Sequence, residues 1–374
     1  MTVWDDLVGQ RRVVETLQRA VAGDMTHAWL FTGPPGSGRS NAAIAFAAAL
    51  QCDRGGCGEC HSCHTASIGS HEDISVTRTQ QLSIGVDDVR RLVRSAALAP
   101  VGRRYQVMVV EDADRLTDQA CNALLKAIEE PTDRTVWLLC APTVEDVLPT
   151  IRSRSRLVVL ATPSPHDVAA YLVAKAGVSP ERAEYAARAS QGHIGRAKAL
   201  ATDEATFDRR REVIRIPTQL TSVGRCITAA ATLHDSATEE SGEMTSRIDA
   251  HERDEIDRMY GVVERGRRPR EYAPAVKDLE KTQKTRAKRR VLDVVDRGLM
   301  DLVSVYRDAI TLQIGAAGGL VNEEARDDVV SLAEHSSAEQ NLARIEAIFT
   351  AREQMLEFNV PPLLALESMM MGLR

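Results

Sequence analysis

Two neighbouring motifs restrict the possible folds of this chain more than any other feature: a turn of the phosphate-loop type and a cluster of cysteines behind it. Residues 33–40 read Gly-Pro-Pro-Gly-Ser-Gly-Arg-Ser, which fits the spacing Gly-x4-Gly-Lys-Ser/Thr except that Arg39 replaces the lysine. Four thiols follow within twelve residues, at Cys52, Cys57, Cys60 and Cys63. Together the motifs predict an α/β nucleotide-binding fold with a metal module inserted after the helix of the loop.

The segments around the loop alternate between strand-like and helix-like patterns. Residues 27–32 form an apolar run ended by Gly33 and two prolines, and the alanine-rich residues 39–50 have high helix propensity. A second buried strand is predicted at 106–110, further strands at 135–141 and 156–160, and an amphipathic helix at 118–130. Strands that alternate with helices imply a parallel sheet covered on both faces, so residues 1–160 are expected to form one α/β domain.

The loop keeps most of the residues that hold a phosphate. In a working loop the glycines allow a tight turn of backbone N–H groups around the phosphates, the lysine reaches the β- and γ-phosphates, and the hydroxyl binds magnesium. Gly33, Gly36, Gly38 and Ser40 retain these features, whereas the planar guanidinium of Arg39 is bulkier than an ammonium group. We expect a loop that binds ATP or ADP weakly or not at all; the alternative is a plain turn without a ligand.

The strand at 106–110 ends in a pair of acids, Glu111 and Asp112. Magnesium-dependent phosphate chemistry needs a carboxylate at the metal and another group that orients the attacking water. An aspartate followed by a glutamate is the usual order, and it is reversed here. A displacement of about 1 Å in such a site can cost on the order of 10²-fold in rate. The alternative is that the two acids merely end a strand.

The cysteine spacing favours structural zinc, because thiolates suit the tetrahedral preference of this ion and a single loop can supply three of them. A redox pair or a cluster without metal is the alternative. His61 and His64 lie nearby as possible substitute ligands. The absence of a secretion signal points to a reducing compartment, where clustered thiols bind metals more often than they form disulfides.

Three arginines lie close together at Arg152, Arg154 and Arg156. They could form local ion pairs on the surface. Alternatively, one of them could act as an arginine finger that stabilises developing phosphate charge in the site of a neighbouring subunit. The residues alone leave both interpretations open.

The remainder of the chain is expected to be helical, as a small domain at 161–202 and a larger one at 203–374. Residues 281–290 carry six cations, which indicate a solvated helix face or a contact with DNA phosphates or an acidic partner. The acidic residues 234–257 contain few large apolar groups and could form a flexible loop. A net charge of −6 argues against a strongly basic nucleic-acid-coating surface, and no apolar run is long enough to span a membrane.

As a set, these motifs resemble the bacterial clamp-loader branch of the AAA+ family. The resemblance covers about residues 4–200. It is carried by the segment from Trp4 to Gln10, the loop at 33–40, the four-cysteine insert, the acidic strand end, the segment from Asn122 to Pro131, and Ser153-Arg154-Ser155. It implies an AAA+ parallel-sheet domain with a zinc knuckle at 52–63, a helical lid at 161–202 and a helical collar at 203–374.

Within that branch, the chain resembles the non-hydrolysing delta-prime subunit of the DNA polymerase III clamp loader. The resemblance adds Thr143, beside Pro142, as the nearest residue to the usual sensor-1 threonine. It also adds Arg196, one residue after a glycine at the sensor-2 arginine position. With Arg39 and the reversed acids, each departure from the ATPase pattern weakens nucleotide chemistry.

What the resemblance implies for function is a cytoplasmic, bacterial, hetero-oligomeric complex that opens a sliding clamp and places it on primer-template DNA. The implied partners are gamma/tau and delta subunits. This chain would lend Arg154 to the ATP site of a gamma/tau neighbour, with Lys126, Glu129 and Glu130 at the same interface. Two alternatives remain: a competent gamma/tau-like ATPase, and a zinc-bearing AAA+ protein outside replication.

Overall fold

The computed structural model describes residues 2–78, 83–102, 104–261 and 269–374. The chain divides into two compact units, Met1–Thr202 and Asp203–Arg374. Within the described residues, no helix has both the length and the apolar character needed to cross a membrane.

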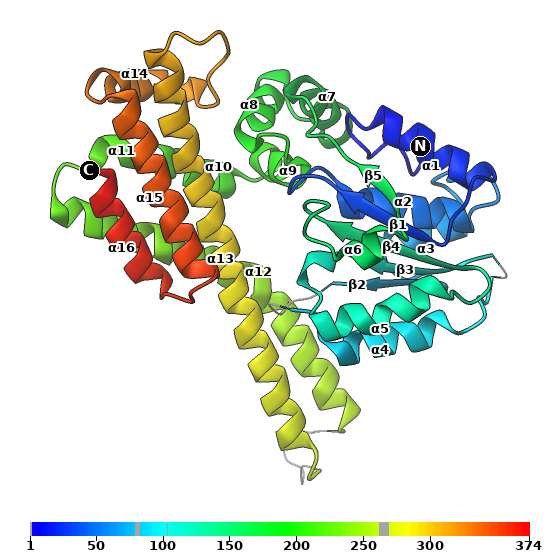
Figure 1. Ribbon diagram of the computed structural model, residues 1–374. Coiled ribbons are helices and arrows are strands. Elements are labelled where there is room, and N and C mark those ends of the chain that lie inside the picture. The colour runs from blue at the N-terminus through cyan, green and yellow to red at the C-terminus, as the bar shows by residue number, and fades with distance from the viewer. Residues whose placement is uncertain (1, 79–82, 103, 262–268) are drawn as a thin grey trace. The chain divides into compact units, whose positions relative to one another are not determined.

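The first unit is built on a parallel sheet, which is shown in Figure 1. In the described part of the chain the sheet has five strands, in the order β2 (Ile74–Thr77), β3 (Gln106–Val110), β4 (Thr135–Ala141), β1 (Ala28–Thr32) and β5 (Arg156–Val159). Neighbouring strands are parallel throughout, and β1 pairs with both β4 and β5. The carboxyl ends of these strands therefore meet at one edge, where the loops after them gather.

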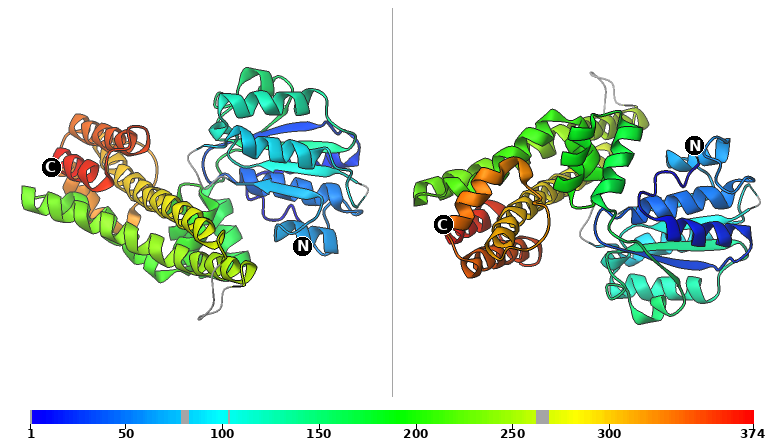
Figure 2. Two further views of the ribbon diagram at one scale, coloured as in Figure 1. Left: turned by 90° about the horizontal axis from the view of Figure 1, so that it is seen from below. Right: turned by 90° about the horizontal axis from the view of Figure 1, so that it is seen from above.

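Alternating residues of each strand face the two sides of the sheet. Trp29 and Phe31 of β1 pack into one core with Phe46, whereas Leu30 packs into a second core with Leu124. Figure 2 shows helices on both sides of the sheet. The helices of this part are α1 (Arg11–Ala22), α2 (Arg39–Gln51), α3 (His61–Ser67), α4 (Val86–Ala96), the short η1 (Ala113–Arg115), α5 (Asp118–Glu129) and α6 (Pro149–Arg152). The predicted α/β fold class is confirmed.

The four strands predicted from apolar runs are present, each to within one residue at either end, but the sequence reasoning missed β2. This edge strand reads Ile-Ser-Val-Thr, and only Ile74 is buried. A short, half-exposed strand without an apolar run gives little periodic signal, so only its pairing with β3 defines it.

Three further helices complete the first unit and pack against one another: α7 (Pro165–Ala176), α8 (Pro180–Ser190) and α9 (Ile194–Thr202). The first two begin in the same way, with a serine side chain that accepts a hydrogen bond from the first turn and a proline at the first helical position.

The second unit is helical throughout its described residues. It consists of α10 (Glu204–Ile214), α11 (Ile216–Gln219), α12 (Val223–Met259), α13 (Tyr272–Gln313), η2 (Glu323–Ala325), α14 (Arg326–Glu334), α15 (Ala338–Leu356) and α16 (Pro362–Leu373). Its core includes Leu233, Leu299, Tyr306 and Leu366. The long helices α12 and α13 lie side by side, as both Figure 1 and Figure 2 show.

The suggestion of a loop in the acidic stretch 234–257 is wrong, because the whole stretch lies in α12. Its acids face basic residues of α13, which were too distant in sequence to be recognised as partners. Glu240 lies 2.6 Å from Arg297, and Glu252 accepts a hydrogen bond of 2.7 Å from Arg286. Opposite charges on facing helices thus stabilise a segment that few large apolar side chains hold in place.

Replacing Arg286 with alanine is expected to destabilise the second unit. The side chain of Arg286 is only 4% exposed, and its removal leaves Asp249 and Glu252 without their partner. Loss of one member of a buried pair costs about 3–5 kcal/mol, and the partial exposure of both acids reduces this to about 2–4 kcal/mol. Thermal or urea unfolding measures the difference, and an unchanged stability would contradict it.

The same ion pair predicts a pH dependence of stability. The hydrogen bond from Arg286, together with that from Gln283, lowers the pKa of Glu252 despite some burial. A carboxyl group whose pKa is lowered in the folded state stabilises that state above its ordinary value, and loses the effect as the pH falls through the lower folded value. The stability difference between wild type and Arg286→Ala should therefore shrink below about pH 4.

Candidate functional site

The loop at residues 33–40 resembles a phosphate-binding loop and is called the phosphate-like loop. It lies between β1 and α2, at the edge where the strands end. Gly36 and Gly38 have φ angles of +83° and +91°, which side chains other than glycine rarely adopt. Gly38 is also the residue that caps the N-terminus of α2. The backbone of the loop thus has the glycine-dependent turn that its sequence indicates.

The loop is held by residues that sequence reasoning did not single out. The imidazole of His193 lies against Gly36 so closely that a Cβ atom on this glycine would come within 2.2 Å of the ring. Next to it, the backbone N–H of Ile194 donates to the carbonyl of Gly36 over 3.3 Å. The start of α9 is therefore fastened directly to the middle of the loop.

Arg39 turns its guanidinium back onto the loop. The Nη1 group donates a hydrogen bond to the carbonyl oxygen of Gly33. Burial lowers the pKa of Arg39, and nearby acids, among them Asp114 and Asp112, oppose this effect. An arginine keeps its charge at any pH at which the protein is folded, so the loop contains a fixed cation directed at its own backbone.

The acid at the end of β3 is also paired within the chain. The carboxylate of Glu111 lies 2.8 Å from Nε of Arg78, and the Glu111 side chain is only 14% exposed. Burial raises the pKa of Glu111, and the charge and hydrogen bond of Arg78 partly offset this. The next residue, Asp112, precedes the short helix η1. The carboxylate placed to bind magnesium thus already has a cation as its partner.

The two sensor candidates lie in different elements. Thr143 follows β4, and its backbone N–H donates to the carboxylate of Asp146 over 2.9 Å. Arg196 lies in α9, and its backbone N–H donates to Nδ1 of His193 over 3.2 Å. His193 thereby links the segment that carries Arg196 to the phosphate-like loop.

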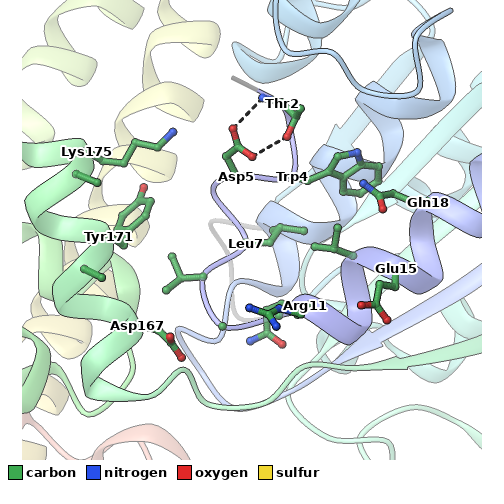
Figure 3. A pocket seen from close by; sticks show the side chains of 16 residues that line it. Thr2, Trp4, Asp5, Leu7, Arg11, Glu15, Gln18, Asp167, Tyr171 and Lys175 are labelled. Atoms are coloured by element: carbon green, nitrogen blue, oxygen red, sulfur yellow. Dashed lines mark hydrogen bonds between the residues drawn. The ribbon is translucent and has the colours of Figure 1, made fainter.

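A cleft of about 820 Å³ lies between the N-terminal segment with α1 and helix α7 (Figure 3). Leu7 and Val14 are among its apolar lining residues, and Lys175 stands at its edge, 3.1 Å from Asp6. No residue of the loop 33–40 lines the cleft. Within the described residues, the structure therefore does not bring this cleft together with the phosphate-like loop.

Arg154 follows the short helix α6 and contacts α5. Its Nη2 atom lies 2.8 Å from the carboxylate of Glu129, and its Nη1 atom donates to the carbonyl of Thr150 over 3.0 Å and to the hydroxyl of Ser153 over 3.2 Å. The side chain is 40% exposed. Within the described residues, its polar contacts are confined to these three and include none with the loop of its own chain.

The four cysteines converge at the end of α2 and the start of α3. Their sulfur atoms all lie within 4.8 Å of one another, and Sγ of Cys52 lies 3.6 Å from that of Cys57 and 3.7 Å from that of Cys60. A zinc ion about 2.3 Å from each of four tetrahedral sulfurs would set them about 3.8 Å apart. The arrangement fits zinc, and the histidines at 61 and 64 are not part of the cluster.

The local backbone favours a thiolate at Cys52, whereas burial raises the pKa of Cys63. Burial alone would raise the pKa of Cys52, but the backbone N–H groups of Cys57, Gly56 and Arg54 lower it to about 6. The N-terminal segment fixes the loop that carries the cysteines: Nε1 of Trp4 donates to the carbonyl of Gly55 over 3.2 Å. The cluster is thus a folded module attached to the main core, with no open position that would indicate catalysis.

Two family models match this chain. Residues 9–164 match the family described as DNA polymerase III, delta subunit, and residues 297–374 match the one described as DNA polymerase III, delta subunit, C terminal.

Curated relatives carry the same names. The DNA polymerase III subunit gamma/tau of Mycobacterium tuberculosis is 40% identical over 156 residues, which is 40% of this chain and 27% of that protein. The delta' subunit of Pseudomonas aeruginosa is 41% identical over 34% of this chain and 41% of its own length. The delta' subunit of Bacillus subtilis is 28% identical over 55% and 64%. The matches thus span between 27% and 64% of these relatives.

Among solved structures, a gamma subunit-related protein from Thermotoga maritima aligns with 77% of this chain and 98% of its own, at 16% identity and a TM-score of 0.39. Two segments of this chain thus match family models of DNA polymerase III delta subunits. The chain is also similar to delta' and gamma/tau subunits, and the resemblance that the motifs predicted is confirmed.

Two residues of this site, Arg78 and His193, were missed by sequence reasoning. Neither belongs to a motif, and their contacts join residues that are 33 and 157 positions apart in the chain. The only signal in the sequence for the contact of His193 was Gly36, because a glycine lets a neighbouring side chain approach the backbone closely.

Proposed function

We propose that this chain is a delta'-type subunit of a DNA polymerase III clamp loader that does not hydrolyse ATP itself. In this role it supports the ATP-dependent loading of a sliding clamp onto primed DNA. The observation that carries the proposal is that both halves of the phosphate site bind side chains of the chain itself. Arg39 bonds to the carbonyl of Gly33, and Arg78 pairs with Glu111.

Each of these contacts opposes a step of ATP hydrolysis. Magnesium binding requires the carboxylate of Glu111, which must first give up a charge-assisted contact with Arg78. The guanidinium of Arg39 is a planar group that bonds in a fixed fork, and it cannot replace the compact ammonium of a lysine at the β- and γ-phosphates. ATP or ADP is therefore bound weakly, if at all.

The role assigned to Arg154 is that of an arginine finger in trans. The side chain is partly exposed and contacts only α5 and its own short segment, so it is available to the site of an adjoining gamma/tau subunit. Lys126 and Glu129 lie on α5, Glu130 follows as its C-terminal cap, and all three would line this interface.

The partners of this role are gamma/tau and delta subunits, the sliding clamp and, through the complex, primer-template DNA in the bacterial cytoplasm. An exposed apolar surface on the second unit supports assembly with other subunits, because contiguous apolar surface marks interaction sites. On α15 it is formed at seven-residue intervals by Leu342, Phe349 and Leu356, which are 53%, 45% and 42% exposed. On α16 it includes Leu364 and Met371.

In this role residues 1–160 act as the AAA+ domain, with zinc at 52–63 as a structural ion. Residues 161–202 act as the lid, and residues 203–374 as the collar through which subunits associate. Thr143 and Arg196 lie near the sensor-1 and sensor-2 positions, but in this role they have no tightly bound nucleotide to contact.

The second candidate function is that of a competent gamma/tau-like ATPase. It is favoured by the 40% identity with the gamma/tau subunit of Mycobacterium tuberculosis over the matched segment. Measuring ATP hydrolysis by the purified chain separates the two functions. Turnover by the chain alone would support the ATPase; turnover only in a complex with gamma/tau would support the delta' role.

Restoring the lysine alone is not expected to restore hydrolysis. In an Arg39→Lys variant, the pairing of Glu111 with Arg78 and the contact of His193 with Gly36 remain. We expect turnover at the level of a reaction without protein, measured as phosphate release. The double variant Arg39→Lys, Arg78→Ala is the control that also frees the carboxylate. Turnover in the single variant would show that Arg39 by itself is the defect.

A further inference from the structure

Four lysines form a continuous stripe along the N-terminal half of α13. They are Lys277, Lys281, Lys284 and Lys288. Their spacing of four, three and four residues places them on one face of the helix, at intervals of about 5–6 Å. All four are exposed, and among the ion pairs of the described residues none involves them. This set is referred to below as the lysine stripe.

The acids of the neighbouring helix α12 do not neutralise the lysine stripe. Arg286 lies on the opposite face of α13, where it contacts Asp249 and Glu252 of α12. Glu280 flanks the stripe and is 3.3 Å from Arg253 of α12. The basic run thus has two faces, one that holds the helix pair together and one that projects lysines into solvent, with the exposed acids Asp278 and Glu280 at its sides.

The lysine stripe continues a face of α13 that is buried further along the helix. Each lysine precedes a buried residue by 18 positions, which is five full turns, so both sets share one face. The buried set is Val295, Leu299, Leu302 and Tyr306. Along this face, the residues that pack in the core of the unit are Val, Leu or Tyr, and the corresponding residues outside the core are lysines. A face that only needed hydration would mix both signs of charge, as exposed surfaces normally do.

A regular line of cations fits the phosphate backbone of nucleic acid. The stripe extends over 12 residues, and its first and last lysines lie about 16 Å apart along the helix. A duplex of that length carries about ten phosphates on its two strands. An acidic protein surface could attract the same charges, but it rarely offers anions at such even intervals.

We infer that the lysine stripe binds the phosphate backbone of nucleic acid, with duplex DNA as its main ligand. It lies between the two segments that match known families, residues 9–164 and 297–374, so neither match covers it. The inference goes beyond the proposed function and does not depend on the phosphate-like loop, the cysteines or Arg154.

The test uses the full chain and a fluorescently labelled duplex of about 30 base pairs, with a single strand of equal length as the second probe. Binding is followed by anisotropy at several salt concentrations. One variant carries glutamine at all four positions of the stripe, and a second carries arginine there. A matched control removes the same charge from exposed arginines elsewhere in the unit, by glutamine at Arg211, Arg215, Arg225 and Arg247. Circular dichroism and melting temperature verify folding.

We expect the glutamine variant of the stripe to bind duplex DNA at least about tenfold more weakly at low salt. The slope of log affinity against log salt should be smaller by about three to four, because each lost phosphate contact removes about 0.9. The arginine variant should bind as the unchanged chain does, and the control should lose much less. A greater loss for duplex than for single strand identifies duplex DNA as the ligand; the reverse identifies single strands, and both support a phosphate-binding stripe.

Three results would overturn the inference. The first is an absence of DNA binding by the unchanged chain at low salt. The second is an equal loss in the stripe variant and in the control, which would show a general effect of net charge. The third is unchanged DNA binding with lost assembly with other subunits, which would show that the stripe contacts an acidic protein.

Discussion

Replacing Arg154 with alanine is expected to abolish most ATP turnover at the single site that receives this residue in an assembled clamp loader. An arginine finger is worth about 10³–10⁵ in rate, or about 4–7 kcal/mol of transition-state stabilisation. The total ATP turnover of the complex should fall by at least the fraction that this one site contributes. The measurement is ATP hydrolysis stimulated by DNA and clamp, with this chain alone as the background.

The structure provides a matched control for this substitution. Arg152 is exposed and is the last residue of the short helix α6, two positions before Arg154, so Arg152→Ala removes an equal charge from nearly the same place. Arg154→Lys keeps the charge but loses the planar fork, and should recover only part of the activity. If Arg154→Ala leaves turnover unchanged in a complex of normal composition, its contact with Glu129 is structural and the finger assignment is wrong.

Replacing Cys60 with serine is expected to cause the largest loss of stability. The purified chain should contain one zinc ion per molecule, measured by elemental analysis, and the variant should contain much less. Structural zinc contributes about 10–16 kcal/mol in small peptides. Because this module is also anchored by Trp4, we expect a smaller loss, of at least about 3 kcal/mol, or roughly 6–12 °C in melting temperature.

His61 and His64 supply the matched controls for the metal site. Both lie on α3 close to the cysteines, but neither belongs to the cluster of four sulfurs. Alanine at either position should leave the zinc content and melting temperature nearly unchanged. A chain that contains no zinc when prepared under reducing conditions, yet melts at the same temperature as one supplied with zinc, would contradict a structural role.

The parts of the site that the sequence predicted are those defined by local chemistry. Glycines at fixed spacing indicated the turn at 33–40, because only glycine adopts its positive φ angles without strain. The close spacing of the cysteines indicated a shared ligand position, and the sulfurs do converge. Apolar runs located three strands that are buried throughout, because both faces of the sheet are covered there, and also the edge strand β5, of which only Val158 is buried.

The parts that the sequence did not predict depend on partners far apart in the chain. The acidic stretch 234–257 looked unable to fold because it contains few large apolar residues, yet it is helical against the basic run of α13. Each run taken alone resembles a solvated or flexible segment. Only their alignment across the helix pair shows which charges are paired and which, as in the lysine stripe, are not.

The sequence by itself therefore determined the resemblance to clamp-loader subunits, four of the five strands, the turn of the loop and the set of converging cysteines, because the signal for each comes from residues close together in the chain. Only the tertiary structure decided which side chains contact the loop and the acid at the end of β3. Arg78 reaches Glu111, and His193 reaches Gly36, through the packing of separate elements. The physical reason is that a charge or a ring acts on whatever lies within a few ångströms, and folding, not sequence distance, sets those neighbours.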